Sequence, residues 1–112
     1  MMNYKEFSKV RKEYGERLDQ IANALFNLEL GDTNCLTFYS VYEQFLDTKC
    51  KFLHVLFDFY KQMHDNSFFF MKPLVARRVR ALCIEHRSTL KTLTLVRLYM
   101  NLLENNKKDE ND

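Results

Sequence analysis

The sequence has few of the residues that make tight turns. Its 112 residues include two glycines, one proline and no tryptophan. An all-β sandwich or barrel needs a turn about every ten residues, and glycine and proline supply much of that turn chemistry. The scarcity therefore argues against a many-stranded sheet protein and favours long helices joined by few loops.

Cysteines and long apolar runs are also scarce. The three cysteines are an odd number, whereas a secreted disulfide scaffold has an even and denser set. The amino terminus, Met1–Glu6, is charged and lacks the apolar stretch of a signal peptide. No stretch approaches the roughly 18 apolar residues of a membrane span. We therefore expect reduced cysteines and an intracellular protein, cytoplasmic or nuclear, with no membrane partner.

Catalytic signatures are missing as well. The sequence contains no G-x-S-x-G motif, no phosphate-binding P-loop and no G-x-G-x-x-G motif. Its three histidines supply few general bases, and His64, which lies beside Asp65, has no nucleophile near it in the sequence. We therefore expect that the protein is not an enzyme.

Hydrophobic residues form 46% of the chain and recur at helical spacing. Apolar residues in steps of three and four predict a first helix that ends near Leu28, with Gly31 as its C-terminal cap. A second helix is expected from about Leu36 to Met63. Pro73 suits the first turn of a third helix, where its missing N–H costs nothing.

The third apolar pattern extends to about Asn105. Ser88 or Thr89 could cap a fourth helix within it, so three and four helices are both open. We predict an all-α fold, a three- to four-helix antiparallel bundle. Residues 1–105 form its single domain, and residues 106–112 form a polar C-terminal tail.

The second predicted helix is apolar on two sides. A helix of this kind is either central in a bundle or in contact with another chain. We interpret the second row and a following aromatic clump as a partner-binding surface, which contains Leu46, Leu53, Phe57, Phe68, Phe69 and Phe70. The alternative is that the clump folds back over the bundle and buries two of its three phenylalanines.

Basic residues form a row in the third predicted helix. Helical spacing places Arg77, Arg80, Arg87 and Lys91 on one face, flanked by Lys72 and Arg78. Between residues 72 and 100 the only acidic residue is Glu85. Such a row can contact the phosphates of a nucleic acid or an acidic protein. The alternative is a solvated face that pairs within the chain with Glu13, Glu16 or Glu43.

Two Cys–His pairs raise the question of a metal. Cys50 and His54 are four residues apart, and Cys83 and His86 are three apart, so each pair shares a helix face. Four such ligands could bind zinc tetrahedrally. The pattern is similar to the two-pair helical zinc sites of retroviral integrase N-terminal domains, although the ligand order differs. A buried cysteine more often acts as a small apolar residue, so we expect no cofactor and keep zinc as the alternative.

These patterns predict a non-enzymatic interaction or assembly protein. Its partner is expected to be a protein, bound through helix packing, and a homo-oligomer is the leading expectation. The alternative is a nucleic-acid-binding or regulatory protein that uses the basic helix face and is stabilised by zinc.

Overall fold

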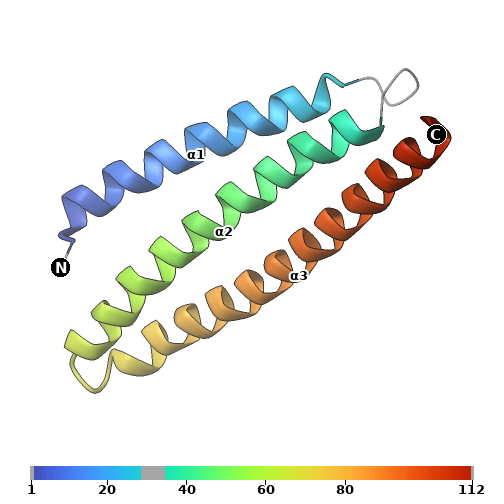
Figure 1. The fold of residues 1–112 in the computed structure, drawn as a ribbon. Coiled ribbons are helices and arrows are strands. Elements are labelled where there is room, and N and C mark those ends of the chain that lie inside the picture. The colour runs from blue at the N-terminus through green and yellow to red at the C-terminus, as the bar shows by residue number, and fades with distance from the viewer. Residues whose placement is uncertain (1, 29–34, 112) are drawn as a thin grey trace.

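The computed structural model describes residues 2–28 and 35–111, and the side chains of residues 2–28 and 36–106. The described residues form three helices: α1 (Tyr4–Phe26), α2 (Cys35–Asn66) and α3 (Lys72–Asn111). Consecutive helices run in opposite directions (Figure 1). The predicted all-α antiparallel bundle is therefore confirmed, with three helices. The predicted cap at Gly31 lies outside the described residues.

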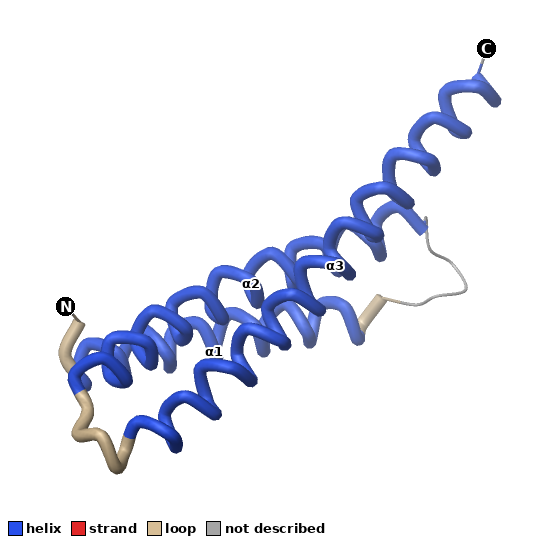
Figure 2. Tube along the Cα trace, turned by 90° about the horizontal axis from the view of Figure 1, so that it is seen from below, coloured by secondary structure: helices blue, strands red, loops and turns tan. Residues whose placement is uncertain are grey.

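Helix α2 lies in the middle of the bundle. Both α1 and α3 pack against it, and in the described part of the chain they do not pack against each other (Figure 1). The molecule is elongated, about 64 Å long and 23 by 21 Å across. Figure 2 shows that the C-terminal end of α3 projects beyond the other two helices.

Helix α1 is held at its N-terminal end by a cap and an aromatic contact. The side chain of Asn3 accepts a hydrogen bond from the backbone N–H of Glu6 at 2.8 Å, which satisfies one of the free N–H groups of the first turn. Phe7 is the buried residue of α1, and its ring stacks on Phe59 of α2 with 3.8 Å between the ring centroids. Farther along, the rings of Tyr14 and Phe52 stack at 5.4 Å.

The buried side chains form two clusters. The first, which we name the three-helix core, draws on α1, α2 and α3 and contains Phe7, Leu53, Leu56, Phe59 and Leu82. The second, the two-helix core, draws on α2 and α3 alone and contains Leu46, Cys50, Leu93 and Val96. The burial of these side chains is the main favourable term for the fold.

Two residues of the predicted partner-binding row belong to these cores. Leu46 is 5% exposed and Leu53 is 3% exposed, so neither is available to a partner on the folded chain. This part of the prediction is wrong because α2 is the central helix. Its apolar side chains are divided between contacts with α1 and contacts with α3.

Helix α3 is continuous through Ser88 and Thr89, where the sequence was compatible with a break between two helices. The buried hydroxyl of Thr89 does not cap a new helix; it donates to the carbonyl of Glu85, one turn earlier, at 2.8 Å. Thr92 and Thr94 make the same kind of bond, at 3.1 and 2.9 Å. The backbone stays helical to Asn111, whereas the sequence predicted a tail from residue 106.

Candidate partner-binding surface

The loop between α2 and α3 presents an aromatic patch. Phe68, Phe69 and Phe70 are 74%, 84% and 63% exposed. The rings of Phe68 and Phe70 stack at 5.8 Å, and Phe69 meets Phe70 edge-on at the same distance. The aromatic rings thus contact one another while the loop leaves them in solvent. The alternative in which two of them are buried by the bundle is wrong.

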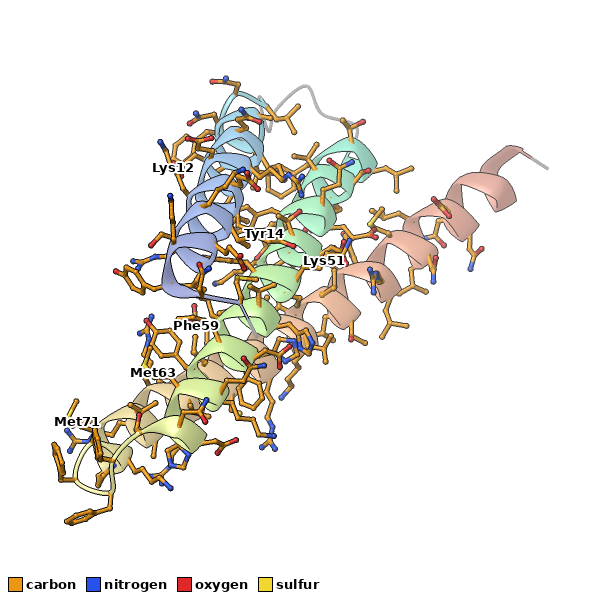
Figure 3. All side chains as sticks on the ribbon, turned by 90° about the vertical axis from the view of Figure 1, so that its left-hand side faces the viewer. Lys12, Tyr14, Lys51, Phe59, Met63 and Met71 are labelled. Atoms are coloured by element: carbon orange, nitrogen blue, oxygen red, sulfur yellow. The ribbon has the colours of Figure 1, made fainter. Side chains whose placement is uncertain are left out.

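Backbone hydrogen bonds shape the loop that carries these exposed side chains. The N–H groups of Met71 and Lys72 both donate to the carbonyl of Phe68, at 2.9 and 3.2 Å, so the chain turns tightly and leads directly into α3. Exposed Met71 and Leu74 extend the apolar surface. Figure 3 shows side chains projecting from the loop at the Met71 end of the molecule. The aromatic loop patch comprises Phe68, Phe69, Phe70, Met71 and Leu74.

Phe57 is the one member of the predicted row that reaches the surface. It is half-buried and lines the groove between α2 and α3. One pocket there, of about 200 Å³, also contains His54, Cys83 and His86. A second pocket, of about 390 Å³, continues along the groove, and the ammonium group of Lys61 lies 5.9 Å from the Phe57 ring.

The predicted basic row forms as expected on α3. Its four residues, Arg77, Arg80, Arg87 and Lys91, are all exposed, and none of them makes an ion pair with a described residue. Helical periodicity places the row away from the buried Leu82 and Leu93, and two of its members, Arg80 and Arg87, border the pockets between α2 and α3.

The two flanking cations lie apart from this row. The guanidinium group of Arg78 lies 5.6 Å from the centre of the Tyr60 ring, in a cation–π contact with α2. Lys72 is half-buried at the start of α3. The outer basic surface therefore consists of the four residues of the row alone.

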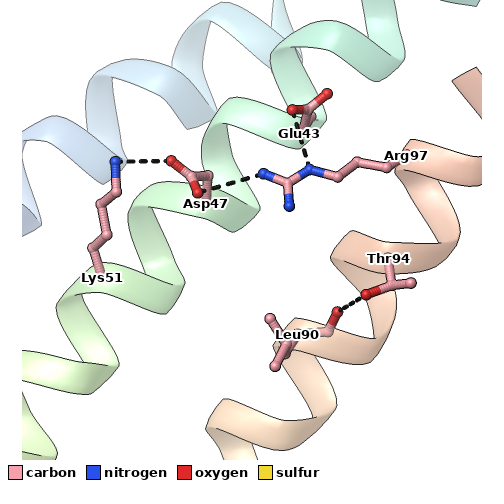
Figure 4. Close-up of polar contacts among 6 residues, drawn as sticks. All are labelled: Glu43, Asp47, Lys51, Leu90, Thr94 and Arg97. Carbon is pink, nitrogen blue, oxygen red and sulfur yellow. Dashed lines mark hydrogen bonds and ion pairs between the residues drawn. The ribbon is translucent and has the colours of Figure 1, made fainter.

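The glutamate considered as an internal partner of the basic row pairs elsewhere. The guanidinium group of Arg97 lies 3.4 Å from a carboxylate oxygen of Glu43 and 3.6 Å from one of Asp47 (Figure 4). Asp47 also pairs with Lys51 at 3.0 Å. These contacts join α2 to α3 beside the two-helix core and leave the outer row without an intrachain partner among the described residues.

The four residues considered as alternative zinc ligands do not form a metal site in the described part of the chain. Cys50 is buried in the two-helix core, whereas His54 is exposed and lies 3.4 Å from Asp58. The rings of His54 and His86 are 6.5 Å apart. Within the residues whose placement is described, no group of three or more Cys, His, Asp or Glu side chains could hold a metal ion.

The chemistry of Cys50 agrees with a packing role. Burial raises the pKa of its thiol, and the nearby carboxylate of Asp47 raises this pKa further. The opposing effects of Arg97 and Lys49 on the thiol pKa are smaller. The thiol is therefore protonated at neutral pH, and it acts as a small apolar side chain rather than as a thiolate ligand or nucleophile.

The sequence interpretation missed an apolar row on the outer face of α3. Leu95, Leu98 and Leu102 are 59%, 55% and 60% exposed, and we call them the outer leucine row. They continue the line of the basic row toward the C-terminus. Their spacing of three and four residues was visible in the sequence. Each of the three leucines lies two residues after a core-facing position, namely Leu93, Val96 and Met100.

Comparisons with known proteins do not add a family. No family model matches the chain, and no curated protein and no solved structure matches it. None of the three described helices is both long enough and apolar enough to cross a membrane. The surface chemistry described above is therefore the basis for a functional proposal.

Proposed function

We propose that this is a non-enzymatic interaction or assembly protein that binds protein partners through apolar surface left uncovered by its own fold. The observation that carries the proposal is the aromatic loop patch. Three neighbouring phenylalanines and the adjoining Met71 and Leu74 are all exposed at one end of the bundle. Soluble monomers rarely expose contiguous apolar patches of this kind unless the patch binds something.

The arrangement of the patch suits binding. Fully burying one phenylalanine side chain is worth about 1.5–3 kcal/mol, so two or three anchors supply much of the free energy of an interface. The rings of Phe68, Phe69 and Phe70 already contact one another, and the loop that carries them is short. Less conformational freedom is therefore lost on binding than for separate flexible side chains.

A substitution in the loop tests the proposal. We expect Phe69→Ser to remove partner subunits that native mass spectrometry detects with the wild-type protein, because the most exposed anchor of the patch is lost. Phe26→Ser is the matched control, since Phe26 is 90% exposed at the far end of α1. Identical assembly masses for wild type and both variants would contradict the proposal.

A second candidate is nucleic-acid binding through the outer basic row. It is favoured by four exposed cations on one helix face without a carboxylate partner among the described residues. If all four contact phosphates, the slope of log K against log salt for a random duplex is about −3 to −4. Arg80→Glu should weaken this binding, and Lys12→Glu on α1 is the control. Absent or salt-independent binding would remove this candidate.

A further inference from the structure

A third pocket extends the groove between α2 and α3 toward α1. It has a volume of about 380 Å³, and residues of all three helices line it, namely Tyr14, Cys50, Lys51, His54, Val55 and His86. His54 and His86 also line the pocket of about 200 Å³, which in turn shares Phe57 and Cys83 with the pocket of about 390 Å³. The three pockets therefore adjoin one another in one groove, which we name the central groove.

The central groove lies where a four-helix bundle has its fourth helix. In such a bundle each helix packs against two neighbours. Here α1 and α3 each pack against α2 alone in the described part of the chain, so α2 forms the floor of the groove between them (Figure 1). Along α2 the lining runs from Cys50 to Asp65, about 22 Å at 1.5 Å per residue, which matches a helix of about 15 residues.

The middle of the central groove is apolar. Phe57 and Cys83 each line two of the pockets, and Ala76 and Val79 continue the apolar lining along α3. All four side chains are half-buried, and none of them belongs to the three-helix core or the two-helix core. The surface that they still expose is available to the apolar side of another helix.

The lining of the central groove carries unpaired positive charge. Among its described residues there is one carboxylate, Asp65, and there are four lysines and arginines, namely Lys51, Lys61, Arg80 and Arg87. Asp65 lies 3.3 Å from His64, and the nearby Asp58 lies 3.4 Å from His54. Of the four cations, Lys51 alone makes an ion pair with a described residue. Three cations beside an apolar floor therefore lack an acidic partner within the described chain.

We propose that the central groove binds an acidic amphipathic helix of a partner protein, which takes the place of a fourth helix. The apolar side of this helix packs on Phe57 and Cys83, and its carboxylates pair with Lys61, Arg80 and Arg87. The groove shares no residue with the aromatic loop patch. It is therefore a second binding site, which goes beyond the proposed function and does not depend on it.

The placement of the cations favours a protein helix over other occupants. Lys61 lines the groove, whereas Arg77 and Lys91 of the basic row do not. A nucleic acid follows the charges and leaves the apolar floor uncovered, whereas an amphipathic helix uses both. In a second copy of this chain, Arg77 adjoins the aromatic loop patch and Lys91 adjoins the outer leucine row, so either surface would bring like charges to the groove.

Synthetic amphipathic helices of about 20 residues test the chemistry of the occupant. The peptides share one stripe of leucines and differ in the flanking residues, which are glutamate, glutamine or lysine. Fluorescence anisotropy with the full chain should give the lowest dissociation constant for the glutamate peptide and the highest for the lysine peptide. Salt should raise the dissociation constant of the glutamate peptide. Equal affinity for the glutamate and lysine peptides, or binding of none, overturns the proposal.

Charge reversals test the location of the site. Lys61→Glu and Arg80→Glu should each raise the dissociation constant of the glutamate peptide about tenfold, because a carboxylate then faces the acidic helix. Lys91→Glu makes the same change of net charge on an exposed residue outside the groove, so its effect should stay below about twofold. Helical circular dichroism checks that each variant is folded. An equal effect of all three reversals overturns the site, because it indicates general attraction to a basic surface.

The thiol of Cys83 gives a readout inside the groove. Because Cys83 is half-buried and lines two of the pockets, the bound glutamate peptide should slow its alkylation, which mass spectrometry measures at this residue. Stronger protection by a random DNA duplex than by the peptide overturns the proposal in favour of nucleic acid. Protection that rises with protein concentration in the absence of peptide overturns it in favour of a second copy.

Phe69→Ser separates this inference from the proposed function. This variant should bind the glutamate peptide with unchanged affinity, because Phe69 belongs to the aromatic loop patch and lies outside the central groove. Peptide binding that is lost with Phe69→Ser but kept with Lys61→Glu overturns the groove and leaves association through the loop standing. Assembly masses that Phe69→Ser does not change contradict the loop, whereas Cys83 protection by the peptide still supports the groove.

Discussion

The two cores of the bundle differ in the number of helices that contribute to them, and the outer face of α3 differs in composition beside each core. All three helices contribute to the three-helix core, and α3 carries a largely basic outer face beside it. Only α2 and α3 contribute to the two-helix core, and there α3 carries the outer leucine row. On the outer face of α3, the exposed leucines thus lie beside the core to which fewer helices contribute. The three-helix half ends in the aromatic loop patch, so each half of the bundle leaves apolar side chains exposed.

The largest effect is expected in the three-helix core. Phe59→Ala should lower the free energy of unfolding by about 3–5 kcal/mol, because the buried ring stacks on Phe7 and its loss leaves a cavity between α1 and α2. Denaturant unfolding measures this change, and hydrogen exchange should show faster opening of α1. Phe69→Ala is the matched exposed control. A loss below about 1 kcal/mol would contradict the importance of this core.

Two nearby leucines of α3, one buried and one exposed, allow a test of the two-helix core. Leu93 is 2% exposed, so Leu93→Ala should cost about 2–5 kcal/mol, whereas Leu95→Ala should stay within about 0.5 kcal/mol in dilute, monomeric protein. The two-helix core contains no α1 residue, so hydrogen exchange in α1 should change less than with Phe59→Ala. Equal losses for both leucines would show that the outer row is part of the monomer's core.

A smaller effect on the free energy of unfolding is expected from the helix propensity of Gly15 in α1. Gly15 lies inside the helix, and a Cβ added there meets no atom within 4 Å. Gly15→Ala should therefore raise the free energy of unfolding by up to about 1 kcal/mol, and Ala24→Gly on the same helix should lower it. Thermal and denaturant melts measure both. A destabilising Gly15→Ala would mean that α1 contributes to packing that the described contacts do not contain.

The smallest effect is expected from the ion pairs beside the two-helix core. The guanidinium group of Arg97 contacts Glu43 and Asp47, but its side chain is 51% exposed. Arg97→Gln should cost about 0.2–1 kcal/mol and less at high salt, because exposed pairs are weak and screened. A double-mutant cycle with Glu43→Gln isolates the pair, and Arg11→Gln on α1 is the control. A coupling above about 2 kcal/mol would be too strong for an exposed pair.

The fold was largely predictable from the sequence, because helical periodicity and the lack of turn residues are local signals. The burial of the second apolar row of α2 was not predictable from the sequence. Leu46 and Leu53 have the spacing of an interface, and only the placement of α3 shows that they are buried within the chain. A helix with apolar residues on two sides can be the centre of a bundle or can bind a partner, so only the tertiary structure distinguishes the two roles.

The candidate surfaces were predicted unevenly for a similar reason. Phe68–Phe70 stood out because three adjacent aromatic residues rarely all turn inward, and the basic row stood out through its charge. The outer leucine row was missed because its residues alternate along the sequence with those of the core row on the other side of α3, so the two rows merge into one apolar stretch when read along the chain. The zinc alternative gains no support, because the packing of α2 on α3 brings His54 and His86 to 6.5 Å between ring centroids, but no group of three or more possible ligands forms among the described residues.

The position of the aromatic loop patch has a consequence for valency. The patch lies at one end of α3, and the outer leucine row lies toward the other. About 28 residues of α3 separate the loop from the centre of the row, roughly 42 Å at 1.5 Å per residue, so a partner bound at one surface would leave the other accessible. A chain with two such surfaces could engage two linked partners at once, so its avidity would depend on the distance between their binding sites as well as on the affinity of each surface.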